Sequence, residues 1–227
     1  MLKLQTYLPS ALTLANLCAG TIAILSDNPF TGLICILIAC LLDIFDGLTA
    51  RWLHASSEFG KQLDSLADIV SFGLAPAVLM HHYLLQDNTI SLVIVCLIPV
   101  FSAIRLAKFN IDQTQKTVFK GLPTPANGLF FASLPWIAEH YFTDIRFPAL
   151  WMYLLILFFS LMMIIPLRMF SFKSLRTPGF NRVIPLLFIV CFIILLIFSG
   201  WLAIPLSILA YIILSIPFHL LYTSQNT

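Results

Sequence analysis

Residues 43–68 read DIFDGLTARWLHASSEFGKQLDSLAD and carry four aspartates at regular offsets. The residues just before them are ICILIACLL, and SFGLAPAVLM follows shortly after. A carboxylate at membrane depth is costly unless it is paired or bound to a cation, so intramembrane acids mark functional sites. This stretch is therefore the candidate site around which the rest of the chain is interpreted.

Composition indicates a polytopic membrane protein. Of the 227 residues, 60% are hydrophobic and 10% are charged, and the mean hydropathy is +0.98. A soluble domain of this size does not need so much apolar surface, whereas each membrane-spanning helix needs about 20 apolar residues. The composition excludes an ordinary soluble domain, and nothing in it indicates a nucleic-acid partner.

Polar breaks divide the chain into about eight apolar segments. The expected fold is all-α, a polytopic bundle of transmembrane helices preceded by a short interfacial lead over residues 1–9. The predicted spans are 10–26, 30–53, 61–85, 90–109, 126–142, 148–169, 183–199 and 201–222.

The basic residues predict the orientation of these spans. With the N-terminus in the cytoplasm, eleven of the twelve Lys and Arg residues fall on the cytoplasmic side, and Arg146 is the exception. This is the positive-inside pattern of integral membrane proteins. It predicts a protein of the cytoplasmic membrane whose four aspartates lie near the cytoplasmic ends of the second and third spans.

The aspartates fall on one face of each of these two helices. In the first helix the spacing i, i+3, i+4, i+7 is that of Asp43, Asp46, Gly47 and Ala50. In the next helix the spacing i, i+4, i+8 is that of Gly60, Asp64 and Asp68. Residues at such spacings share a helix face. The link between the helices is short, so the two acidic faces are expected to meet.

Four carboxylates in one place repel one another, and divalent cations relieve that repulsion. Oxygen ligands favour Mg²⁺, Mn²⁺ or Ca²⁺ over Zn²⁺. Two metal ions bridged by carboxylates suit phosphoryl chemistry, because they hold a diphosphate and stabilise the leaving group. Arg51 adds a fixed cation suited to a phosphate.

Two other interpretations stay open at this point. Isolated polar residues in membrane helices often make helix contacts, and intramembrane acids also line the cation pathways of transporters. A cation-coupled transporter explains the acids, but it explains neither their position at one membrane face nor Arg51.

The offsets resemble a known signature. The CDP-alcohol phosphotransferase motif is matched at every fixed position by Asp46-Gly47-x2-Ala50-Arg51-x8-Gly60-x3-Asp64-x3-Asp68, with Asp43 three residues upstream. The resemblance implies an integral-membrane enzyme that transfers a substituted phosphate from a CDP-linked donor to an alcohol and releases CMP.

The resemblance also implies roles for single residues. Asp43, Asp46, Asp64 and Asp68 would surround two divalent ions, Mg²⁺ or Mn²⁺, with Asp68 also acting as the general base. Contacts to the CDP part would come from Gly47, Ala50, Arg51 and Gly60. Asn16 is either a further nucleotide contact or a helix–helix hydrogen-bonding residue.

Three further stretches resemble the phosphatidylserine synthases of bacterial type: SFGLAPA (71–77), RLAKFN (105–110) and FKGLPTPANG (119–128). They imply transfer of a phosphatidyl group from CDP-diacylglycerol to L-serine. Arg105 and Lys120 are then candidates to bind the acceptor, whereas Lys108 is assigned to the helix end and lipid phosphates. Glycerol 3-phosphate, inositol phosphate and choline stay open as alternative acceptors.

The chain is expected to form one integral-membrane domain over residues 1–227. The resemblance covers about residues 5–170 and implies a homodimer. The core of six helices is expected over about residues 1–170. Residues 171–227 would add a basic loop and two C-terminal helices that carry no recognised motif.

Overall fold

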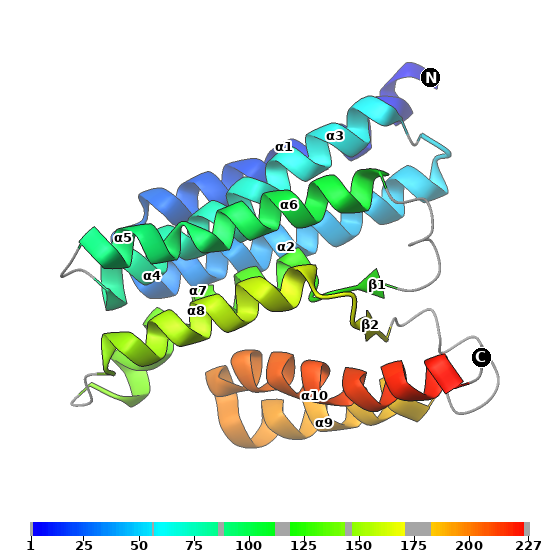
Figure 1. Ribbon diagram of the computed structural model, residues 1–227. Helices are drawn as coiled ribbons and strands as arrows, with labels where there is room; N and C mark the ends of the chain where they lie inside the picture. Colours follow the sequence, from blue (N-terminus) through cyan, green and yellow to red (C-terminus); the bar gives the residue numbers. More distant parts are fainter. Residues whose placement is uncertain are drawn as a thin grey trace.

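The computed structural model is a helical bundle, and it describes residues 2–55, 57–85, 89–111, 119–143, 147–170 and 183–224. Figure 1 shows long helices running roughly side by side, with two short strands at one end. In chain order the elements are α1 (Leu2–Leu25), α2 (Pro29–Trp52), α3 (Glu58–Asp68), η1 (Ile69–Leu74), α4 (Ala75–Leu84), α5 (Thr89–Val95), α6 (Leu97–Ile111), β1 (Phe119–Lys120), α7 (Thr124–Tyr141), α8 (Ala149–Ile164), β2 (Arg168–Met169), α9 (Val183–Ser199), η5 (Gly200–Leu202) and α10 (Ala203–Ser224).

The predicted all-α membrane bundle is confirmed, with a helical segment for each predicted span. Segments long and apolar enough to cross a membrane are Tyr7–Leu25, Pro29–Trp52, Glu58–Leu84, Thr89–Ile111 and Val183–Leu220, the last of which contains α9 and most of α10. The apolar helix α8 is shorter, with 16 residues. The predicted basic loop after residue 170 lies outside the described residues.

Two predicted boundaries were wrong because of prolines. The first span was expected to begin at residue 10, but α1 begins at Leu2 and contains Pro9, whose carbonyl accepts a hydrogen bond from Thr13 Oγ1 at 3.1 Å. Membrane helices tolerate such prolines when neighbours satisfy the backbone. The sixth span was expected to reach residue 169, but α8 ends at Ile164. The next residue is extended because it precedes Pro166, which disfavours helical backbone there.

The turn between α2 and α3 brings the acidic stretch together at one end of the bundle. At the end of α2, His54 adopts a left-handed conformation with φ of 51°, and the Ala55 N–H donates to the Ala50 carbonyl at 3.0 Å. The chain then reverses, and Ser57 caps α3 by accepting a hydrogen bond from the Gly60 N–H at 3.0 Å. α1 packs against both α2 and α3 on this side of the bundle.

The third span is not a regular helix, because the π-helical segment η1 follows Asp68 directly. The Ala75 N–H reaches back to the Val70 carbonyl, five residues earlier. Pro76 lacks an N–H, and its ring crowds the carbonyl four residues before it, which favours such a widened turn. The apolar pattern predicted a single span over residues 61–85 and did not indicate this segment.

Other helices cross η1 at very close range. A Cβ atom at Gly20 of α1 would lie 2.6 Å from Ser71 Cα, and one at Gly128 of α7 would lie 2.8 Å from Phe72 Cα. Only glycine fits where backbones approach so closely. These crossings fix the position of Asp68, which immediately precedes η1.

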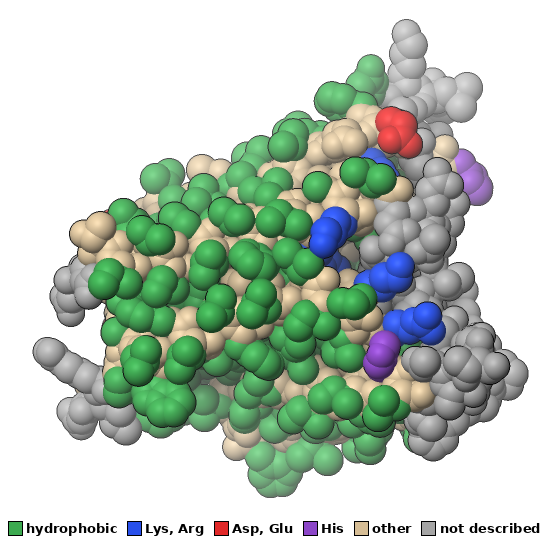
Figure 2. Space-filling view, viewed as in Figure 1, with side chains coloured by type: hydrophobic (Ala, Val, Ile, Leu, Met, Phe, Trp, Pro, Cys, Tyr) green, Lys and Arg blue, Asp and Glu red, His purple; other side chains and the backbone are tan. Residues whose placement is uncertain are grey.

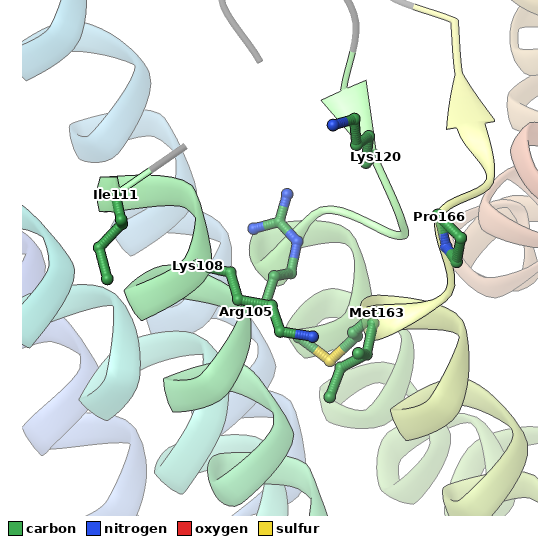
Figure 3. Close-up of a pocket in the computed structure, with 7 residues that line it drawn as sticks. Arg105, Lys108, Ile111, Lys120, Met163 and Pro166 are labelled. Carbon is green, nitrogen blue, oxygen red and sulfur yellow. The ribbon is translucent and has the colours of Figure 1, made fainter. Parts of the chain in front are cut away.

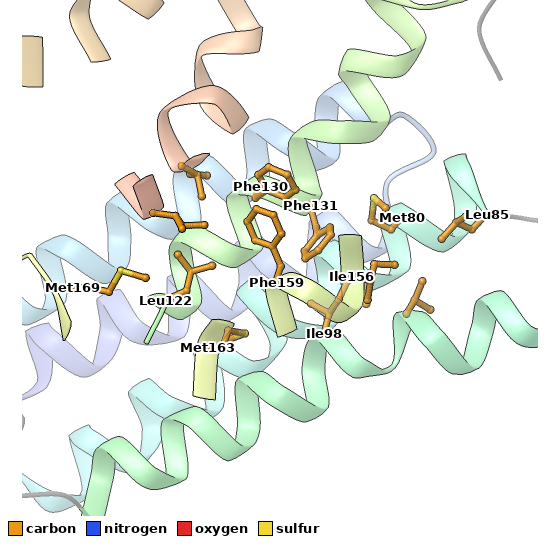
Figure 4. Packing of buried hydrophobic residues seen from close by; sticks show 14 residues of the cluster. Met80, Leu85, Ile98, Leu122, Phe130, Phe131, Ile156, Phe159, Met163 and Met169 are labelled. Atoms are coloured by element: carbon orange, nitrogen blue, oxygen red, sulfur yellow. The ribbon is translucent and has the colours of Figure 1, made fainter. Parts of the chain in front are cut away.

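A buried hydrophobic cluster anchors the short strands to the bundle. Figure 4 shows Leu122, just after β1, and Met169 of β2 in the same cluster as Phe130 and Phe159. Those two rings stack with their centroids 3.9 Å apart. The strands pair in antiparallel register next to this cluster.

The surface separates apolar sides from a basic end. On the face seen in Figure 2 the coloured side chains along the bundle are hydrophobic, whereas the visible Lys and Arg side chains gather toward the end where β1 and β2 lie. This distribution suits a helical bundle surrounded by lipid, with one polar end at the membrane surface.

Candidate active site

Three of the four aspartates converge as the sequence predicted. Asp43 of α2 and Asp64 and Asp68 of α3 each offer a carboxylate oxygen, and these oxygens lie within 4.8 Å of one another. The side chains of Asp43 and Asp64 are in hydrogen-bonding contact. A group of carboxylate oxygens at this separation can hold a hard divalent cation.

Asp46 lies beside this group and is held differently. Its Oδ2 accepts a hydrogen bond from Thr13 Oγ1 at 2.8 Å, so α1 fixes the carboxylate. Asp46 also interacts electrostatically with Asp43 and Asp68. Its predicted place among the metal ligands therefore stays a prediction. The contact of Thr13 with Asp46, 33 residues along the chain, was not predicted from the sequence.

Several buried polar atoms at the site make no hydrogen bond among the described residues. They include one carboxylate oxygen each of Asp64 and Asp68 and both amide atoms of Asn16. Asn16 is completely buried and approaches Asp68 from α1, though without ordinary hydrogen-bond geometry. Unpaired buried polar atoms are rare and require an explanation. A bound cation would pair with the carboxylate oxygens, and a polar ligand would pair with the amide.

Gly47 and Arg51 follow Asp46 on α2, toward the end of that helix. Arg51 is exposed, and its Nε donates to the Gly47 carbonyl at 2.8 Å. A Cβ atom at Gly47 would meet only Arg51 Nη2, at 3.7 Å, which is an ordinary contact. Packing within the described protein therefore does not require glycine here, whereas close approach by a ligand would.

A cavity of about 350 Å³ carries a basic group. Figure 3 shows the guanidinium group of Arg105 between α6 and β1. Arg105 is 8% exposed, donates from Nη1 to Thr124 Oγ1 at 2.8 Å, and interacts electrostatically with Asp68. The lining residues are Arg105, Lys108, Ile111, Lys120, Met163, Ile164 and Pro166.

The cavity brings Arg105 and Lys120 together, as expected of two residues that bind one acceptor. It also includes Lys108, which the sequence analysis assigned to the helix end and lipid. The sequence already indicated that Lys108 lies beside Arg105, because residues three apart on one helix share a face. The cavity thus presents three cations among the described residues.

Polar contacts hold α6, which carries Arg105, against α3, which carries Asp64 and Asp68. Lys61 Nζ donates to the Asn110 carbonyl at 2.8 Å, and Asn110 Nδ2 donates to Ser65 Oγ at 2.8 Å. These contacts join the end of α6 to α3. The sequence placed Asn110 in a recognisable stretch but did not reveal this link.

Comparison with known proteins identifies the family. The model of the family described as CDP-alcohol phosphatidyltransferase matches residues 6–145, more than half of the chain. The chain belongs to the CDP-alcohol phosphatidyltransferase family. The matched region contains the four aspartates, Arg51, Arg105 and Lys120.

Similar members of this family share one name. Proteins named CDP-diacylglycerol–serine O-phosphatidyltransferase are 40% identical to this chain over 132 residues in Mycobacterium leprae, 37% over 129 residues in Bacillus subtilis and 34% over 129 residues in Methanocaldococcus jannaschii. The alignments cover 54%, 55% and 57% of this chain and 44%, 73% and 60% of the relatives. The chain thus spans less than half of the first relative's length.

Proposed function

We propose that this protein transfers the phosphatidyl group from CDP-diacylglycerol to L-serine, forming phosphatidylserine and releasing CMP. The observation that carries the proposal is the convergence of Asp43, Asp64 and Asp68, together with the electrostatic interaction of Asp68 with Arg105. Arg105 lines a basic cavity suited to an acceptor, so a candidate cation site and a candidate acceptor site are linked through Asp68 and Arg105. The names of the similar family members support serine as that acceptor.

The carboxylates fit a divalent metal by donor type and separation. We propose two ions, Mg²⁺ or Mn²⁺, held by Asp43, Asp46, Asp64 and Asp68. When bound, such ions hold the diphosphate oxygens and stabilise the charge on the departing CMP.

Side chains of this protein bind the CDP part of the donor. Arg51 binds the diphosphate with its guanidinium group. Gly47, Ala50 and Gly60 leave space for the CDP group, and the unpaired amide of Asn16 contacts it. These small residues lie on the two helices that carry the acids, so the donor phosphorus comes close to Asp68.

Asp68 takes the proton of the serine hydroxyl as its oxygen attacks the phosphorus that carries the diacylglycerol. The new P–O bond forms while the bond to the CMP oxygen breaks, and CMP leaves with the electron pair of that bond. Positioning of both substrates and removal of the proton together lower the barrier. Arg105 and Lys120 bind the serine carboxylate through charge-assisted hydrogen bonds.

The cavity also supports a second candidate acceptor. Lys108 joins Arg105 and Lys120 in its wall, and three cations suit a phosphorylated alcohol such as glycerol 3-phosphate. The transfer reaction would be the same. Inositol phosphate belongs to this class, whereas choline, which is itself a cation, is disfavoured by the same wall.

We place the site at the cytoplasmic face of the cytoplasmic membrane, where a water-soluble alcohol reaches it. The support is the gathering of Lys and Arg at the end that carries the strands. The homodimer rests on the family resemblance. The division into a core over residues 1–170 and a C-terminal part stays a prediction.

One assay separates the candidates. Purified protein in detergent with CDP-diacylglycerol is given L-serine, glycerol 3-phosphate, inositol phosphate or choline, and CMP and the lipid product are measured. We expect CMP and phosphatidylserine with L-serine only. Turnover with glycerol 3-phosphate alone would move the assignment to the phosphorylated acceptor, and no CMP with any alcohol would favour a cation-coupled transporter.

A further inference from the structure

One side chain in the wall of the acceptor cavity comes from the short strand β1 and not from a helix. Lys120 lies on β1, which has two residues and pairs with the two residues of β2 as Phe119 with Met169 and Lys120 with Arg168. Beyond it, the Gly121 N–H donates to the Leu167 carbonyl at 2.9 Å. A strand pair this short is not stable by itself.

The C-terminal helix α10 holds β2 from the other side. The Arg168 N–H donates to His219 Nδ1 at 3.2 Å, and Tyr211 Oη donates to the Phe170 carbonyl at 3.0 Å. These two contacts bracket Met169, which is completely buried. The backbone on both sides of Met169 is therefore tied to α10.

Aromatic packing reinforces these hydrogen bonds. Phe170, Ile184 and Phe218 form a separate buried cluster, against which the partly buried Tyr211 packs. The rings of Phe170 and Tyr211 have centroids 4.6 Å apart in an edge-to-face arrangement, which favours attraction between aromatic rings. In Figure 1 the α9–α10 pair lies beside the bundle at the end that carries β1 and β2.

α10 also packs beside the cavity itself. Ile208 and Ile212 of α10 belong to the same buried cluster as Leu122 and Met163, and Met163 lines the cavity. The C-terminal helix α10 therefore borders the acceptor side of the site.

We propose that the α9–α10 hairpin positions the acceptor pocket: Tyr211 and His219 hold β2, and β2 holds Lys120 of β1 at the cavity. The inference rests on the proposed function, because it assigns these residues to the acceptor half of that site. Tyr211 and His219 act through the strands and are positioning residues. Weakening their contacts changes acceptor binding and leaves the CDP-diacylglycerol half unaffected.

The test uses Tyr211→Phe, His219→Leu and His219→Asn in the full chain. Tyr211→Phe removes one hydroxyl, and His219→Leu removes the acceptor of the Arg168 N–H. In His219→Asn the amide oxygen takes the place of Nδ1 and restores that acceptor. Ser207→Ala is the matched control, because its hydroxyl bonds only within α10, to the Ile204 carbonyl at 2.8 Å.

Two measurements are made on each variant. Hydrogen–deuterium exchange of peptides covering 119–122 and 165–170 reports the hold on the strands, whatever reaction the protein catalyses. We expect faster exchange there in Tyr211→Phe and His219→Leu, and wild-type exchange in His219→Asn and Ser207→Ala. Unchanged exchange in both weakened variants would overturn the inference.

Steady-state kinetics then test the consequence. We expect the acceptor KM to rise about three- to tenfold, the effect of losing one hydrogen bond, with the KM for CDP-diacylglycerol unchanged. Equal rises in both KM values, or no rise despite faster exchange, would contradict the positioning role. Absence of turnover in the wild type would instead reject the proposed function, and the exchange data would still decide whether α10 holds the strands.

Discussion

At the scale of single residues, Asp68 is the side chain that connects the two halves of the site. Its carboxylate belongs to the group with Asp43 and Asp64, and it also interacts electrostatically with Arg105, which lines the cavity. It is 6% exposed, with one oxygen lacking a hydrogen-bond partner among the described residues. This link to both groups supports the proposal that Asp68 is the base.

Asp68→Asn is predicted to fold and to lose turnover by at least about a hundredfold, because an amide cannot take the proton of the attacking hydroxyl. CMP release and the melting temperature in detergent are measured together. Asp27→Asn is the control, since Asp27 is exposed and precedes α2, far along that helix from Asp43. Full turnover by Asp68→Asn would remove the base from the mechanism.

Thr13→Val is predicted to raise the Mn²⁺ concentration needed for half-maximal activity about five- to tenfold. The change removes the hydroxyl that orients Asp46 at 2.8 Å, and second-sphere partners of metal ligands typically contribute about tenfold or more to metal affinity. Thr21→Val on the same helix is the control, because that hydroxyl bonds locally to the Leu17 carbonyl. An identical Mn²⁺ dependence in both variants would show that Asp46 needs no such support.

At the scale of elements, hydrophobicity predicted the helices well, since each predicted span contains one. The spacing of Asp43, Asp64 and Asp68 also predicted their meeting, because helix periodicity and a short link determine it. The π-helical segment after Asp68 was not predictable from apolar pattern. It depends on Pro76 together with close crossings by helices distant in the sequence.

The residues of the cavity could be predicted from the sequence, but their meeting could not. Arg105 and Lys120 belong to recognisable stretches, but their meeting depends on β1, β2 and α10. Pairing between two-residue strands leaves no periodic signal, and the contact of His219 with Arg168 joins residues 51 positions apart. The sequence indicated which residues matter here, and tertiary packing decides where they lie.

Two glycines are predicted to respond differently to the same substitution. Gly128→Ala would place a Cβ atom 2.8 Å from Phe72 Cα and destabilise the fold by about 1–3 kcal/mol, the usual range for overpacking. Gly47→Ala meets no close atom, so its melting temperature is expected to match the wild type while its KM for CDP-diacylglycerol rises. Melting curves and donor kinetics on both variants check this contrast, and equal melting temperatures would contradict the close crossing at η1.

At the scale of the whole molecule, the apolar sides and the basic end suit a bundle with one polar end at a membrane surface. The strands, and with them Lys120 of the cavity wall, lie at the end where the visible Lys and Arg side chains gather. From the positive-inside pattern we propose that this end lies in the cytoplasm. With the proposed function, the donor lipid would approach from the bilayer and the alcohol from water.

The orientation predicts where the ends of the chain lie. With eight spans and a cytoplasmic N-terminus, the C-terminus is also cytoplasmic, so green fluorescent protein fused after residue 227 is expected to fluoresce. Alkaline phosphatase fused after residue 143, between α7 and α8, is expected to be active outside. A dark C-terminal fusion would show an odd number of spans or the opposite orientation.

The central claim is that the carboxylate group, loaded with a divalent ion, supports transfer of a phosphatidyl group. The most direct measurement is CMP and lipid product formed from CDP-diacylglycerol and L-serine by purified protein, before chelation, after chelation and after addition of Mg²⁺ or Mn²⁺. The account predicts equal amounts of CMP and phosphatidylserine, the loss of both with the chelator, and their recovery with the metal. Undiminished turnover in excess chelator, or the absence of CMP with metal present, would contradict it.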